Sequence, residues 1–275
     1  MGRGARSRSR LTATVVAAAV FAGVAATASP AAGIHRGDPA AIAVHPYMVS
    51  LRLADEPDSP RCGGTLIEPD IVLTAAHCVI GVPQGGLVAV IGADIPDWTR
   101  VPIFDTRGHA FPDTADVSVD NRDDIALVQL ATLVLHPTVE LATAEPRVGE
   151  QVLTAGWGCT NAPPVCEEMA TDLRASAQAV LDEQAECGTD VFWTNPLYYA
   201  PTTICTKGVR DRSTINRGDS GGPLLVAGPG GRGFRQVGVT TLGADSTTEL
   251  YAGFTSLPTE AEWIAEAIEE LRRSA

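Results

Sequence analysis

Residues 217–223 read RGDSGGP, and this stretch decides the fold and the chemistry of the chain. Glycines flank the Asp219-Ser220 pair, so the backbone can approach another molecule closely and adopt conformations that other residues resist. In such a turn the amides of Gly218 and Ser220 can point at one oxygen atom, as a developing oxyanion requires. A glycine-rich turn with an incidental serine is the alternative, and it requires the other motifs of the chain to be coincidences.

Two further motifs supply a base and an acid. Residues 73–78, LTAAHC, end an apolar strand at His77, and residues 123–127, DDIAL, place Asp124 directly before an apolar strand. Taken alone, His77 fits a structural role, and Asp124 fits a strand-end residue. Together with Ser220 they predict a triad in which His77 is the base, Asp124 orients it and Ser220 is the nucleophile.

The remaining chain reads as short β segments separated by Gly, Pro, Asp and Asn, so the predicted fold class is all-β. Many short strands with frequent turn signals are typical of a sandwich or a barrel. Helical spacing appears only in residues 260–271, which we expect to form a short helix with one face on the second half of the chain. The clearest predicted strands are residues 47–53, 64–67, 71–74, 87–91, 125–130, 151–155, 223–226 and 236–241.

The motifs TAAHC, DIAL and GDSGGP, in this order, resemble the three signatures of the trypsin/chymotrypsin-like serine protease family, in a secreted, bacterial-type form. The resemblance extends from about Ile34 to the terminal helix and includes CGGTLI at 62–67 and GWG at 156–158. It implies two six-stranded antiparallel β-barrels with a short C-terminal helix, barrel one spanning about 34–145 and barrel two about 146–275. It also implies hydrolysis of peptide bonds through an acyl-enzyme. A catalytically silent homologue that acts as a binding module is the alternative. An esterase of another fold requires the chain order Ser, acid, His, whereas here His77 and Asp124 both precede Ser220.

The sequence also predicts disulfide pairs and the residues of a substrate pocket. None of the six cysteines has the paired spacing of a zinc site, so we expect disulfides. The resemblance implies a Cys187–Cys205 pair, a Cys62–Cys78 pair would fix the turn that carries His77, and Cys159 and Cys166 remain to pair with each other. The resemblance also places Thr241 at a family Ser position whose hydroxyl hydrogen-bonds the buried acid. The residues that match the substrate pocket are Thr214, Arg217, Thr241, Leu242, Gly243 and Ala252.

Thr214 matches the bottom of the primary pocket, where relatives that cut after Arg or Lys carry Asp. A buried cation without a facing carboxylate is unfavourable, so we expect uncharged residues at P1, the position before the cleaved bond. The alternative is basic specificity supplied by Asp211 or Asp245. The resemblance further implies a zymogen, activated when a new N-terminal ammonium on Ile34 pairs with Asp219.

The N-terminal residues predict secretion. Arginines precede an apolar stretch at 11–25 and a small-residue cleavage site at 26–28, which indicates a signal peptide over 1–28, a pro-segment over 29–33 and a peptidase domain over 34–275. A membrane anchor is the alternative, but the apolar run is short. Removing residues 1–33 takes away four arginines and no acid, so the formal charge moves from −13 to −17.

This acidic charge argues against nucleic acid or anionic membranes as partners. We expect an extracellular monomer whose partners are protein or peptide substrates and protein inhibitors. The chemistry requires no cofactor, and we expect no metal ion at the site.

Overall fold

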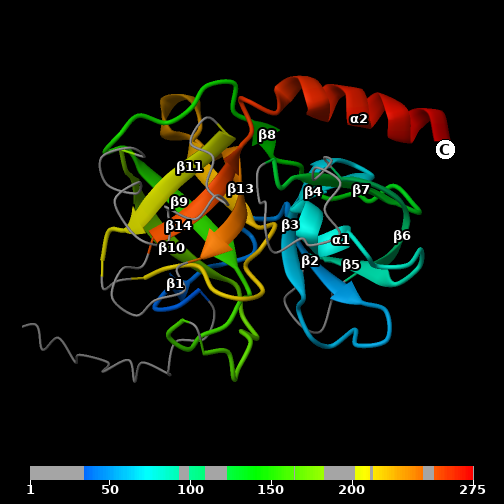
Figure 1. Ribbon diagram of the computed structural model, residues 1–275, viewed down its shortest axis with the longest axis horizontal. Coiled ribbons are helices and arrows are strands. Elements are labelled where there is room, and N and C mark those ends of the chain that lie inside the picture. The colour runs from blue at the N-terminus through cyan, green and yellow to red at the C-terminus, as the bar shows by residue number, and fades with distance from the viewer. Residues whose placement is uncertain are drawn as a thin grey trace, which may run out of the picture.

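The computed structural model describes residues 34–92, 99–108, 123–163, 165–182, 202–210, 213–243 and 251–274. Two β-barrels lie side by side and the C-terminal helix runs along one of them (Figure 1). Each barrel is a closed ring of six strands, as the resemblance implies. No helix among these residues has the length and apolar character needed to cross a membrane. The predicted signal peptide and pro-segment lie outside the described residues.

The first barrel closes in the order β2-β3-β4-β7-β6-β5. Inward-facing aliphatic side chains such as Leu51, Leu66 and Leu73 are fully buried, because each strand turns one face to a shared interior. A single-turn helix, α1 (Ala76–Val79), follows the third strand of the ring. The strands are β2 (Met48–Leu53), β3 (Cys62–Glu68), β4 (Ile71–Thr74), β5 (Leu87–Ile91), β6 (Thr99–Gly108) and β7 (Ala126–Leu130).

The second barrel follows the order β10-β11-β14-β13-β12-β9, and pairing between β9 and β10 closes the ring. Two short strands from the N-terminal half join it from outside: β1 (Asp38–Pro39) pairs with β10, and β8 (Glu140–Leu141) pairs in parallel with β13. The ring strands are β9 (Gln151–Gly156), β10 (Arg174–Val180), β11 (Thr203–Gly208), β12 (Pro223–Ala227), β13 (Phe234–Gly243) and β14 (Tyr251–Ser256). A 3-10 turn over Pro229–Gly231 links β12 to β13.

The expected position of the terminal helix is wrong. Helix α2 (Ala261–Ser274) packs on the first barrel, against β6 and β7, and not on the second half of the chain. Its buried face, Ile264, Ala267 and Leu271, joins the core of that barrel. The spacing of these residues predicts a buried face, but it carries no information about which barrel receives it.

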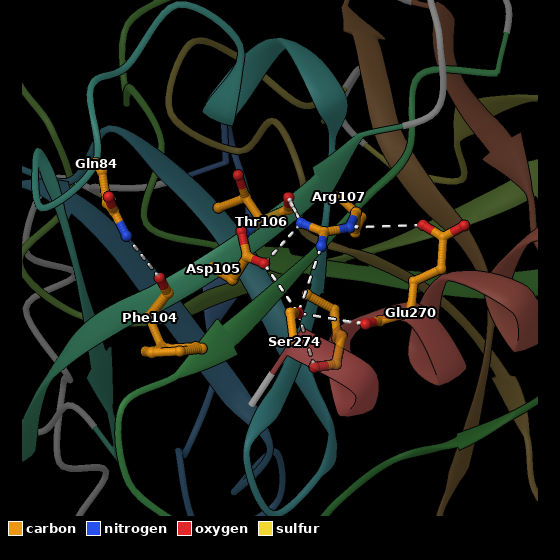
Figure 2. A network of polar contacts seen from close by, with 8 residues as sticks. Gln84, Phe104, Asp105, Thr106, Arg107, Glu270 and Ser274 are labelled. Atoms are coloured by element: carbon orange, nitrogen blue, oxygen red, sulfur yellow. Dashed lines mark hydrogen bonds and ion pairs between the residues drawn. The ribbon is translucent and has the colours of Figure 1, made fainter.

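Polar contacts hold the last turn of α2 to the edge of the first barrel. Arg107 on β6 lies between Asp105 and Glu270, and the Ser274 hydroxyl contacts Asp105 (Figure 2). The distance from Arg107 Nη1 to Asp105 Oδ2 is 2.7 Å, and that from Arg107 Nε to Glu270 Oε2 is 3.5 Å. These groups are partly exposed, so the apolar face of the helix contributes most of its attachment.

Candidate active site

Strand pairing brings His77 and Asp124 together. In the first barrel β4 pairs with β7 so that Thr74 faces Ala126; His77 lies three residues beyond Thr74, and Asp124 two residues before Ala126. Both motifs therefore meet at the same end of the strand pair. His77 Nδ1 lies 2.6 Å from Asp124 Oδ2, and the His77 backbone N–H donates to Asp124 Oδ1 at 2.9 Å.

Strands of the second barrel complete the surroundings of Asp124. The Thr241 hydroxyl on β13 donates to Asp124 Oδ2 at 2.5 Å, which is the contact that the resemblance implies. The Thr255 hydroxyl on β14 donates to the Asp124 carbonyl at 3.2 Å. The Asp124 side chain is fully buried, so hydrogen bonds from His77 and Thr241 to its carboxylate take the place of water.

Asp124 determines the protonation behaviour of His77. Burial by itself lowers the pKa of His77, but the charge of Asp124 and its hydrogen bond outweigh this and raise the pKa above its usual value. Arg61, an exposed residue whose Nε donates to the Cys78 carbonyl, acts in the opposite direction. The His77 side chain remains 28% exposed, so one edge of the ring is open to a substrate.

The turn that carries Ser220 has the backbone geometry expected of an oxyanion site. Gly218 has φ of +90° and Gly221 has φ of +79°, values that side chains disfavour. A Cβ atom on Gly221 would also overlap the Thr74 hydroxyl. The N–H groups of Gly218 and Ser220 donate to no described residue, so both remain available for an oxygen atom of another molecule.

Contacts between the barrels place this turn beside the first barrel. The Gly63 N–H on β3 donates to the Ser220 carbonyl at 2.7 Å, and the Thr74 hydroxyl donates to the Gly63 carbonyl at 2.8 Å. The Ser220 hydroxyl makes no hydrogen bond to any described residue, so the contact with His77 Nε2 is not formed here. Such contacts are often loose without substrate.

Asp219 and Ile34, the predicted activation pair, are both buried. The Asp219 carboxylate accepts the N–H groups of Gly158 and Asn216 at 2.8 Å and 2.9 Å. Burial raises the pKa of Asp219 to about 7, although these two hydrogen bonds act against the rise. No ion pair to Asp219 is formed by the described residues, and the pairing with Ile34 stays a prediction.

The predicted pocket residues lie on neighbouring strands and on the segment before Ser220. The register of β13 and β14 sets Gly243 opposite Ala252. Thr214 is fully buried, its N–H donates to the His35 carbonyl at 3.1 Å, and its hydroxyl has no partner among the described residues. Arg217 is exposed. The side chain of Leu242, and all of Asp211 and Asp245, lie outside the described residues.

Two of the expected disulfides are present. Cys62–Cys78 ties the start of β3 to α1, and Cys159–Cys166 closes a loop beside the Ser220 turn. Cys205 is disulfide-bonded, and its expected partner Cys187 lies outside the described residues. The sulfur atoms of Cys62 and Cys78 lie near a ring nitrogen of His77, but the disulfide removes both as metal ligands.

One contact near the site was not expected from the sequence. Asp123 has a positive φ of 55°, and its side chain meets that of Glu260, the residue before α2. The doublet Asp123-Asp124 is visible in the sequence, but nothing there points to its partner 137 positions later.

Comparison with known proteins gives one consistent result. A family model described as Trypsin matches residues 34–264. Trypsin theta of Drosophila erecta is 27% identical over 240 residues, covering 86% of each chain. Granzyme H of Homo sapiens is 32% identical over 189 residues, covering 66% of this chain and 71% of that protein.

The solved structure of neuropsin, a serine protease expressed in the limbic system of mouse brain, superposes with a TM-score of 0.71. At 22% identity it covers 86% of this chain and 100% of its own, which shows a shared fold. These relatives come from animals, so the expectation of a bacterial-type member has no support from them.

Proposed function

The chain belongs to the trypsin family of serine proteases, and on that premise we propose that it is a secreted endopeptidase with His77, Asp124 and Ser220 as its catalytic triad. The observation that carries the proposal is the buried Asp124 carboxylate, which bonds to His77 Nδ1 at 2.6 Å and to the Thr241 hydroxyl at 2.5 Å. This contact leaves Nε2 as the nitrogen that takes up a proton.

The proposed reaction follows from these positions. Ser220 Oγ attacks the carbonyl carbon of the cleaved bond while His77 Nε2 removes its proton. The oxyanion accepts hydrogen bonds from the N–H groups of Gly218 and Ser220. His77 then donates the proton to the leaving amine, and water hydrolyses the acyl-enzyme by the reverse sequence of proton transfers.

A burst experiment tests the triad. Mixing the active chain with a chromogenic active ester should release about one equivalent of product rapidly before slower turnover, and a serine-directed phosphonate should label Ser220. Ser220→Ala and His77→Ala should each abolish nearly all turnover without additivity, because triad members act as a unit. A Ser220→Ala protein with undiminished, phosphonate-sensitive turnover contradicts the assignment. A silent homologue would bind peptide without any burst.

The proposed P1 preference is for uncharged side chains. It is supported by Thr214, which is fully buried and brings a hydroxyl but no charge. A matched set of peptide anilides that differ only at P1 tests this preference. We expect higher kcat/KM for Leu, Phe or Ala than for Arg or Lys, with modest differences among the apolar residues because one methylene changes transition-state binding by about 1–3 kcal/mol. A higher kcat/KM for Arg or Lys contradicts the neutral pocket.

We also propose activation by cleavage before Ile34. A free ammonium beside Asp219 would favour the ionised carboxylate and lower its pKa from about 7. The N-terminal sequence of purified active protein tests this step. Active protein that keeps residues before Ile34, or that tolerates a tag fused there, contradicts it.

We further propose that the protein acts as an extracellular monomer on protein or peptide substrates and is open to protein inhibitors. Mass spectrometry of the secreted product would show the cleaved signal peptide, and sedimentation would show one subunit.

A further inference from the structure

A loop of the second half of the chain supports the turn that carries the proposed nucleophile. The Cys159–Cys166 disulfide closes this loop. The Asn161 side-chain oxygen, inside the loop, accepts the N–H groups of Glu167 and Glu168 at 2.9 Å and 3.2 Å. The loop is therefore braced by a covalent bond and by one of its own side chains.

The start of the loop contacts the turn through backbone groups. The Cys159 N–H donates to the Arg217 carbonyl at 2.7 Å, and the Gly158 N–H donates to the Asp219 carboxylate at 2.8 Å. In a planar trans peptide the C=O and N–H groups point in opposite directions. The bond to the Arg217 carbonyl therefore turns the Gly218 N–H away from the loop, and this N–H is one of the two that the proposed oxyanion requires.

Asn216 joins the loop and the turn through its side chain. Its amide nitrogen donates to the carbonyls of Asn161 and Val165, at 2.9 Å and 3.4 Å. Its amide oxygen accepts the Arg217 N–H at 2.8 Å. One side chain thus connects two carbonyls of the loop to the backbone of the turn.

The backbone of Asn216 is itself the beginning of the turn. Its N–H donates to Asp219 Oδ2 at 2.9 Å, and its carbonyl accepts the Asp219 N–H at 3.0 Å. The chain beyond the disulfide returns to the oxyanion site at Met169, whose methyl group would overlap a Cβ atom on Gly218. Asn216 therefore sits where a shift of the loop would be passed on to the turn.

We propose that Asn216 is a positioning residue of the oxyanion site. By binding two carbonyls of the disulfide-closed loop, its side chain keeps the Cys159 N–H against the Arg217 carbonyl and so directs the Gly218 N–H to the substrate. Without these bonds the Arg217–Gly218 peptide rotates more freely, and its N–H faces the oxyanion for only part of the time. The inference rests on the proposed function for the role of Gly218, whereas the attachment of Asn216 to the loop does not depend on it.

Two variants of Asn216 remove the donor in different ways. Asn216→Leu keeps the approximate shape without hydrogen-bonding groups, and Asn216→Asp keeps an acceptor for the Arg217 N–H but offers no donor to the two carbonyls. We expect kcat for a peptide anilide to fall about 10- to 100-fold in both, less than the roughly 100- to 1,000-fold loss that follows removal of an oxyanion-site donor. KM should stay within about twofold, because the weakened interaction is made only in the transition state.

Glu167→Leu is the matched control, because Glu167 follows Cys166 directly and its side chain is exposed. Its kcat and KM should equal those of the wild type. Binding of an uncleaved peptide to Ser220→Ala gives the ground-state reference, and adding Asn216→Leu should change this affinity by less than about twofold. A loss of affinity as large as the loss of kcat would show that Asn216 shapes the binding surface, and it overturns the positioning role.

The disulfide provides an independent arm of the test. The double variant Cys159→Ala, Cys166→Ala opens the loop and leaves Asn216 in place, and we expect a lower kcat with an unchanged KM. Both changes act on one contact, so the combination with Asn216→Leu should be about as severe as the more severe change alone. Losses that multiply in the combined variant overturn the coupling through the loop. If Asn216→Leu does not fold, Asn216→Asp takes its place in this comparison.

Hydrogen exchange tests the attachment without any need for turnover. In a Ser220→Ala background, which prevents self-digestion, the bond to the Arg217 carbonyl should protect the Cys159 N–H. We expect Asn216→Leu to accelerate exchange of this N–H roughly tenfold or more and to leave the amides of β4 unchanged.

The outcomes separate this inference from the proposed function. Unchanged exchange of the Cys159 N–H overturns the attachment of the turn through Asn216. Faster exchange with an unaltered kcat in the Asn216 variants overturns the positioning role. Absence of turnover in the wild type overturns the proposed function and the positioning role together, while the exchange measurement still decides whether Asn216 holds the turn to the loop.

Discussion

The Asp124 carboxylate, fully buried, is surrounded by donors from both barrels. His77 contributes two of them and Thr241 the third, so the charge that orients the imidazole is itself held by a residue of the other barrel. A hydrogen bond to a charged group contributes about 1.5–3 kcal/mol, more than a neutral one. The Thr241 hydroxyl therefore helps to hold Asp124 in position and stabilises its negative charge.

Replacing Thr241 by valine removes this donor and preserves the side-chain volume. We expect kcat to fall about 10- to 100-fold, because the imidazolium that forms in the transition state loses part of its counter-charge. Thr241→Ser keeps the hydroxyl and should retain most of the activity. Steady-state kinetics with one peptide anilide measures both variants, and equal losses in valine and serine would show that the methyl group, not the hydroxyl, is what matters.

His77 should give the acid limb of kcat/KM an apparent pKa above 6.5, because Asp124 raises the pKa of the free imidazole. Arg61 acts against this rise, so Arg61→Gln should move the limb to still higher pH. Arg273→Gln, which removes an exposed cation at the far end of α2, is the control and should leave the limb unchanged. A limb that stays in place when Arg61 is neutralised contradicts this electrostatic role.

At the scale of elements, the sequence predicts strands where apolar residues are continuous and fails where they are not. Residues 71–74 and 87–91 form β4 and β5 with the predicted bounds. Strand β10 was missed because the buried positions of RASAQAV include the polar residues Arg174, Ser176 and Gln178. Gln178 Nε2 donates to the Ser176 hydroxyl at 2.7 Å inside the barrel. Strands β6, β11 and β14 carry charges, glycines or a proline that weaken the same signal.

The candidate site, like the strands, could be predicted from the sequence only in part. Its three motifs are local, so each was visible in the sequence, and Thr241 followed from the resemblance. The contact between Asp123 and Glu260 joins distant segments and depends on where α2 begins, which no local pattern specifies. Nothing in the sequence distinguishes either acid from the other acidic residues of the chain.

Helix α2 should be held mainly by its apolar face. Leu271 is fully buried in the core of the first barrel, so Leu271→Ala should lower the free energy of unfolding by about 2–5 kcal/mol. Arg107 is about one-third exposed, so Arg107→Ala should lower it by only about 0.2–1 kcal/mol. Urea unfolding measures both. A larger loss for Arg107→Ala than for Leu271→Ala would show that the polar network in Figure 2 dominates.

At the scale of the whole molecule, a buried hydrogen bond fixes one barrel against the other. The Thr65 hydroxyl on β3 donates to Gln236 Oε1 on β13 at 2.5 Å, and both side chains are fully buried. His77 and Asp124 belong to one barrel and Ser220 to the other, so this bond helps to set the relation between base and nucleophile.

A double-mutant cycle tests this coupling. Gln236→Leu leaves the Thr65 hydroxyl without its acceptor, and Thr65→Val leaves the Gln236 oxygen without its donor. Each should lower the free energy of unfolding by about 1–3 kcal/mol, and the double variant should recover part of the loss. We also expect kcat to fall in each single variant. Gln151→Ala, at an exposed position of β9, is the control. Additive losses would contradict the coupling.

Each barrel is contacted by an element from the other half of the chain. Strand β1 pairs with β10 of the second barrel, and helix α2 covers β6 and β7 of the first. The two disulfides whose partners are both described span residues 62–78 and 159–166, so neither crosses the link between β8 and β9. A backbone cut in that link would therefore produce two fragments that stay together through noncovalent contacts. Each fragment would carry an element, β1 or α2, that packs on the barrel of the other fragment. In size-exclusion chromatography the nicked molecule should therefore elute as a single particle until a denaturant separates the two fragments. If the fragments were produced separately, each barrel would lack the element that the other fragment supplies. Only association of the two fragments would restore the complete molecule.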